Sequence, residues 1–135
     1  MSYCKKTNYG KATSSLLNTC LCYFRIQREF AALLPAAGTL ENDFVRSSIL
    51  AKAIRLAFHD AAEIDITQTD LLGPDGCLSR TYANAGLVTF GDYNATIVDT
   101  LFDPIYQRYC NLITRADFWT LLAWFAINTG LQYAA

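Results

Sequence analysis

The sequence predicts a small, mainly α-helical domain. Apolar residues recur at helical spacing along much of the chain. Hydrophobic residues make up 53% of the sequence and charged residues 17%, a composition that supports a packed core and argues against intrinsic disorder. A length of 135 residues suits one domain. We expect residues 1–22 to form a loose polar arm and residues 23–135 to form the helical domain.

The first helices are predicted from apolar spacing and from residues that cap helices. The apolar positions between 23 and 37 suit a short first helix. Asn42 or Asp43 is a suitable N-cap for a second helix, which continues to about Ala61. A third helical stretch is expected between residues 84 and 109.

The last helix has the clearest boundaries. Thr114 is a suitable N-cap, and Gly130 is expected just after the helix ends. The residues between them are apolar on nearly every face, which predicts a helix buried on most sides or one that awaits a partner. We expect its two tryptophans, Trp119 and Trp124, to belong to the core rather than to a redox relay.

Charge and hydropathy argue against several classes of function. The net charge is −1, and no basic block runs along the chain, so nucleic acid is not an expected partner. The longest apolar run, residues 118–127, is too short to span a bilayer. Polar residues follow Lys5 and Lys6, where a secretory signal would have an apolar segment.

One cluster of residues carries chemistry. Arg55 and His59 are four residues apart, so they share one face of the predicted second helix, and Phe58 lies beside them. Cleaving the O–O bond of a peroxide needs a base that moves a proton from one oxygen to the other, and an imidazole does this near neutral pH. A fixed cation stabilises the charge that develops as the bond breaks. His59 and Arg55 suit these two roles.

Arg55-x-x-Phe58-His59-Asp60 resembles the distal motif of the plant, fungal and bacterial haem peroxidase superfamily. Other segments resemble that family in the same order, between about residues 44 and 130. The resemblance implies a helical domain equivalent to the distal half of a haem peroxidase, with Phe58 in the haem pocket. It also implies haem b as cofactor, hydrogen peroxide as oxidant and a small reducing substrate.

The resemblance implies further site residues. Asn84 matches the asparagine that accepts a hydrogen bond from the distal histidine, although Asn94 is a rival because the intervening segment is longer than in the family. Asp60, Gly73 and Asp75 match ligands of a calcium ion in the secreted members. Cys77 replaces a serine hydroxyl of that site, and a thiol is a poor ligand for calcium.

The cysteines and one asparagine bear on the compartment. The five cysteines leave at least one unpaired within the chain. Cys77 and Cys110 are candidates for a disulfide, or could both be free core residues. Asn94 begins an Asn-Ala-Thr glycosylation sequence. The resemblance and the cysteines favour an extracellular location.

His59 is the only histidine in the sequence, so it leaves no candidate for the proximal histidine that holds the haem iron in the family. Three hypotheses follow. The first is a peroxidase completed by a longer chain, a second subunit or a symmetric partner. The second is an inactive, peroxidase-derived protein that binds another protein or a second copy of itself through its apolar C-terminal helix. The third is that this sequence is a fragment.

Overall fold

The computed structural model describes residues 16–64, 66–67, 73–78, 82–87 and 96–134. These residues form four α-helices and no strand: α1 (Leu16–Ala32), α2 (Leu40–Ala62), α3 (Asp103–Tyr109) and α4 (Arg115–Ala134). Two shorter segments are a 3₁₀ turn, η1 (Tyr82–Asn84), and a π-helical turn, η2 (Val98–Phe102). The predicted mainly α-helical class is confirmed.

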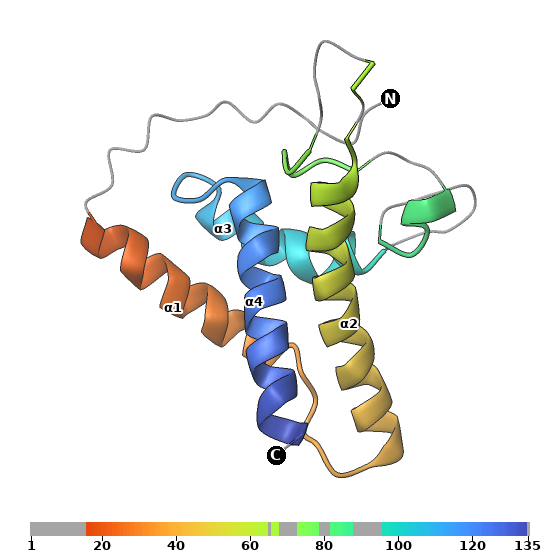
Figure 1. Ribbon diagram of the computed structural model, residues 1–135. Coiled ribbons are helices and arrows are strands. Elements are labelled where there is room, and N and C mark those ends of the chain that lie inside the picture. Colours follow the sequence, from red (N-terminus) through yellow and green to blue (C-terminus); the bar gives the residue numbers. More distant parts are fainter. Residues whose placement is uncertain (1–15, 65, 68–72, 79–81, 88–95, 135) are drawn as a thin grey trace.

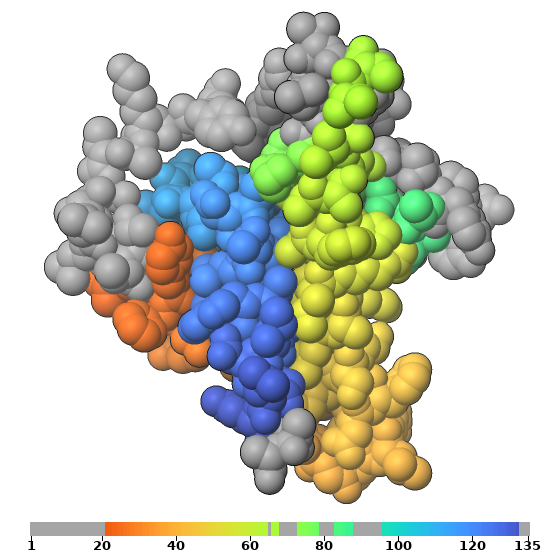
Figure 2. All heavy atoms as spheres, viewed as in Figure 1, coloured from red at the N-terminus to blue at the C-terminus, as the bar shows by residue number. Residues whose placement is uncertain are grey.

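The helix α4 is the centre of the domain. In Figure 1 it stands between α1 and α2, and its most extensive contact is with α2, which runs in the opposite direction. The short helix α3 packs at the end of α4 where that helix begins, and the ring centroids of Tyr106 and Phe118 are 5.4 Å apart. Figure 2 shows α2 and α4 side by side on one face of the molecule.

The core lies where these helices meet. The side chains of Phe30, Phe102 and Trp119 are among the largest that are fully buried. The ring of Phe30 in α1 lies near two other aromatic rings, with its centroid 6.1 Å from that of Phe102 and 6.4 Å from that of Phe125 in α4. Burying large aromatic side chains supplies much of the free energy that holds a domain of this size together. None of the helices described is both long and apolar enough to cross a membrane.

Side-chain caps explain where two helices begin. The α2 helix is capped by Thr39, whose hydroxyl oxygen accepts a hydrogen bond from the backbone N–H of Asn42 at 3.2 Å. Asn42 and Asp43, the predicted caps, therefore lie inside the first turn. Thr114 caps α4 as predicted, and its hydroxyl accepts from the N–H of Asp117 at 3.1 Å.

Other boundaries differ from the prediction. The α1 helix begins at Leu16, so residues 16–22, expected in the polar arm, are helical. Cys22 and Ile26 are buried on the same face as Phe30, and this burial stabilises the earlier start. Gly130 lies inside α4 instead of after it.

The third helical stretch and one tryptophan also differ from the prediction. The described part of residues 84–109 is divided into η1, η2 and α3. Trp119 belongs to the core as expected, whereas Trp124 is 55% exposed. Trp124 lies on the exposed face of α4, together with Ile127 and Leu131, so the prediction of a core position for it is wrong.

Candidate functional site

The site begins with two side chains on one face of α2. Arg55 and His59 are one helical turn apart, and Nε of Arg55 donates a hydrogen bond to Nε2 of His59 at 3.3 Å. A guanidinium has donors and no acceptor, so Nε2 of His59 must be the acceptor in this contact. Nε2 of His59 therefore carries no proton and presents its lone pair to Arg55.

The other ring nitrogen of His59 faces Asn84, which lies in η1. The distance from Nδ1 of His59 to Oδ1 of Asn84 is 2.7 Å. The amide of Asn84 is oriented by Glu63, because its Nδ2 donates to Oε1 of Glu63 at 3.3 Å. The Asn84 oxygen is consequently directed at His59, and Nδ1 carries the ring proton and donates it. Glu63, Asn84, His59 and Arg55 form one continuous hydrogen-bonded chain.

Arg55 is held in place by backbone atoms. Its NH1 group donates to the carbonyl of Ala85 at 3.2 Å, and its NH2 group donates to the carbonyl of Ala83 at 2.5 Å. These two bonds use one side of the guanidinium and direct Nε toward His59. The positive charge of Arg55 is therefore fixed in position beside the imidazole before any substrate binds.

The polar pair borders an apolar surface. Phe58 is 68% exposed, and its ring lies against that of His59, with centroids 5.9 Å apart and planes at 73°. Ile54, one turn earlier on α2, is also exposed. A base, a cation and open apolar surface thus lie together at the C-terminal half of α2.

No protein-family model, no curated protein and no solved structure matches this chain. The functional argument therefore depends on the residues and on their geometry. An imidazole with one basic nitrogen and one fixed donor nitrogen can take a proton from a bound substrate and return it. The adjacent guanidinium can stabilise negative charge on the same substrate.

The residue after His59, Asp60, is buried and organises the neighbouring loop. Its carboxylate accepts hydrogen bonds from the backbone N–H of Gly76 at 3.0 Å and from that of Cys77 at 3.2 Å. Burial raises the pKa of Asp60 to about 6, and these backbone hydrogen bonds only partly oppose that rise. Asp60 therefore joins the end of α2 to residues 73–78, directly beside the site.

The residues that resemble calcium ligands have other partners. Asp60 binds the two loop amides, and the Asp75 side chain accepts from the N–H of Cys77 at 2.8 Å, as in an Asx-type turn. The backbone carbonyl of Gly73, the atom through which this residue could bind calcium, accepts from the N–H of Asp75 at 2.7 Å. Among the described residues, no group of three or more acidic, histidine or cysteine side chains could hold a metal ion.

The candidate disulfide between Cys77 and Cys110 is not formed, because Cys110 has a free thiol. Cys110 lies at the C-cap of α3, and its thiol donates to the carbonyl of Gln107 at 3.5 Å, within the last turn of the same helix. Asn94, both as a glycosylation site and as the rival to Asn84, lies outside the described residues.

Sequence reasoning brought together Arg55, Phe58, His59 and Asn84 but missed Glu63. A signal for Glu63 exists, since it follows His59 by four residues, just as His59 follows Arg55, at the end of the same helix. The carbonyl groups of residues 83 and 85 carry no such signal, because every residue has a carbonyl.

Proposed function

We propose that this chain carries the distal half of a haem-dependent peroxidase, which reduces hydrogen peroxide and oxidises a small organic donor. The observation that carries the proposal is the hydrogen-bonded chain that leaves Nε2 of His59 unprotonated beside the Arg55 guanidinium. Reduction of hydrogen peroxide to water consumes protons and electrons in equal number, and the organic donor supplies the electrons.

Each side chain has a distinct part in this reaction. His59 accepts a proton at Nε2 from one oxygen of the peroxide. It then delivers this proton to the other oxygen, which departs as water. Arg55 stabilises the negative charge that builds on the departing oxygen. Asn84 holds the proton on Nδ1 of His59, so that Nε2 carries the lone pair and acts as the base once the substrate displaces the 3.3 Å hydrogen bond from Nε of Arg55. Haem, when bound, supplies the iron that holds the peroxide and passes it electrons.

The residues fit one face of a haem. Phe58 and Ile54 offer exposed apolar surface beside the polar pair, as a flat apolar macrocycle requires. A second imidazole to hold the haem iron has no candidate in this sequence, because His59 is its only histidine. A histidine that holds the iron would therefore have to come from a longer chain, a second subunit or a second copy.

The proposal is tested with ferric haem, free imidazole as the axial ligand, and hydrogen peroxide. The wild-type chain should give a saturable Soret band and should accelerate peroxide cleavage in stopped-flow measurements. His59→Ala and Arg55→Ala should each lower that rate by about 100-fold, while far-UV circular dichroism stays unchanged. Lys52→Ala, on the same helix before the site, is the matched control and should keep the wild-type rate. Equal rates for wild type and His59→Ala would refute the proposal.

A second candidate function is the binding of another copy of this chain through the outward stripe of α4, which consists of Trp124, Ile127 and Leu131. All three side chains are exposed, and their spacing places them on one face of the helix. Monomeric proteins rarely expose a contiguous apolar surface of this kind. Light scattering should detect a dimer that Trp124→Gln combined with Ile127→Gln dissociates. A monomer at all concentrations would exclude this candidate.

A further inference from the structure

The side of α2 that faces away from the core carries a regular line of exposed residues, which we call the α2 seam. Its members follow one another at alternating intervals of four and three residues: Leu40, Phe44, Ser47, Ala51, Ile54 and Phe58. Leu40 is 93% exposed and Phe44 is 77% exposed, so most of their apolar surface is open to a partner. This alternating spacing is the one with which two helices interlock their side chains.

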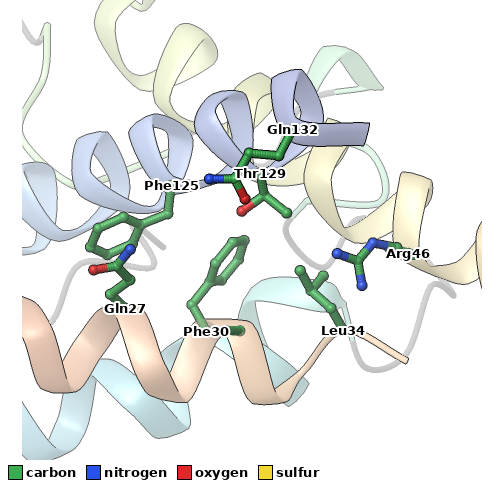
Figure 3. Close-up of a pocket in the computed structure, with 8 residues that line it drawn as sticks. Gln27, Phe30, Leu34, Arg46, Phe125, Thr129 and Gln132 are labelled. Carbon is green, nitrogen blue, oxygen red and sulfur yellow. The ribbon is translucent and has the colours of Figure 1, made fainter. Parts of the chain in front are cut away.

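The seam lies on the opposite side of α2 from the side that anchors the helix in the domain. The buried residues Ile49, Ala53 and Leu56 lie almost half a turn away from it. Arg46 is on this inner side too, and Figure 3 shows its side chain extending toward Leu34. The helix is therefore held through its inner side, and the seam can receive a partner without any change in the fold.

The charges beside the seam are opposite at its two ends. Glu41 directly follows Leu40, and Arg55 directly follows Ile54, so the two charges lie on the same flank of the seam. Both are seven residues from position 48, near the middle of the seam. Two copies of α2 that run antiparallel about this middle therefore place Glu41 of each copy beside Arg55 of the other. A parallel pair would instead bring like charges together.

The sizes of the seam residues are also self-complementary. Antiparallel pairing opposes the large apolar side chains of one end to those of the other, Leu40 to Phe58 and Phe44 to Ile54. The small residues Ser47 and Ala51 lie in the middle, where they let the two helices approach closely. We infer that two copies of this chain pair through their α2 seams, with the two helices antiparallel.

This surface overlaps one proposed site and is separate from another. Ile54 and Phe58 belong to the apolar surface that the proposed function assigns to haem, so haem and a second copy exclude one another there. The inference concerns the chain without haem and does not rest on the proposed function. The exposed stripe of α4 is a different surface, so pairing through either helix can fail without the other.

Light scattering of the haem-free chain, between about 1 and 500 μM, should show an equilibrium between monomer and dimer. Ala51→Arg places like charges at the middle of the pair and should raise the dissociation constant at least about 100-fold. Because Ala51 is exposed, the far-UV circular dichroism of this variant should stay unchanged. Ala32→Arg, the same change at an exposed residue of α1, is the matched control and should dimerise like the wild type.

Two further variants separate the charge contact of the seam from the stripe of α4. Glu41→Lys brings a like charge beside Arg55 of the second copy and should weaken the dimer at least about tenfold. Trp124→Gln combined with Ile127→Gln alters only the stripe of α4 and should leave the dimer intact. A monomer at all concentrations, or a dimer that Ala51→Arg does not weaken, would overturn the inference.

The antiparallel arrangement is tested with two cysteine substitutions in the seam, Phe44→Cys and Ile54→Cys. In an equimolar mixture under mild oxidation, disulfides should join position 44 of one chain to position 54 of the other, as peptide mass mapping can show. Phe44→Cys alone should not cross-link at position 44, because the two copies of that position lie about 15 Å apart along the helix axis. A disulfide between the two copies of position 44 would indicate a parallel pair and overturn the inference.

Discussion

Replacing Gly76 by alanine should destabilise the protein far more than the addition of a single methyl group suggests. Gly76 has a φ of +78°, a conformation that residues with a Cβ atom adopt only at a cost. A Cβ atom there would lie 2.7 Å from Cβ of Arg115 and 2.8 Å from the backbone nitrogen of Ala116. Both atoms belong to the first turn of α4, which has little freedom to move away.

The expected decrease in the free energy of unfolding has two contributions. The left-handed conformation costs about 1–2 kcal/mol for an alanine. The overlap with α4 adds about 1–3 kcal/mol, as in other overpacked sites. The free energy of unfolding should therefore fall by about 2–5 kcal/mol in Gly76→Ala. Because the Gly76 amide also binds the Asp60 carboxylate, the end of α2 beside His59 should be disturbed as well.

Gly73→Ala is the matched control. Gly73 has a φ of +83°, but a Cβ atom there would meet nothing within 4 Å, so only the conformational cost applies. In urea denaturation followed by circular dichroism, the midpoint should fall by about 1–2 M for Gly76→Ala and by about half as much for Gly73→Ala. Equal midpoints for the two variants would refute the argument from close packing against α4.

Three further predictions concern titration, tautomer and thiol reactivity. Burial raises the pKa of Asp60 to about 6, so Asp60 contributes up to about 3 kcal/mol of stability that is complete below about pH 4 and is lost as the pH rises through 6. Urea unfolding should show this decrease in the wild type but not in Asp60→Asn. In ¹⁵N NMR, His59 should carry its proton on Nδ1, and Asn84→Ala should move part of it to Nε2; an unchanged ring spectrum would contradict the assigned role of the amide. Iodoacetamide should label Cys110 at least about tenfold faster than Cys22, whose thiol is buried and has a pKa raised by burial, as peptide mass mapping can measure.

Local signals in the sequence were sufficient to predict some of the helix boundaries but not others. The N-cap at Thr114 was predictable because the cap and the N–H that it binds are three residues apart. The start of α1 was not predictable, because the burial of Cys22 near that start depends on helices α3 and α4, which are distant in sequence. Thr39 was overlooked as the cap of α2 because Asn42 and Asp43, which follow closely, are equally good capping residues.

Some contacts of the candidate site were likewise predictable from the sequence, and others were not. The contact between Arg55 and His59 follows from helical spacing and was predicted. The bonds from Arg55 to the carbonyls of Ala83 and Ala85 depend on how a loop returns to α2, which no spacing rule gives. The hydrogen bonds from the amides of Gly76 and Cys77 to Asp60 join residues 16 and 17 positions apart, so local spacing gives no signal for them.

The anchoring of Arg55 by carbonyl groups affects how this site can evolve. The side chains of residues 83 and 85 are not the groups that bind the guanidinium, and the side chain of Ala83 is exposed. Mutations at these two positions can therefore accumulate without removing either acceptor, provided that the backbone keeps its path. The orientation of the cation is thus protected against sequence drift in the segment that holds it, whereas His59 and Asn84, which interact through their side chains, have no such tolerance.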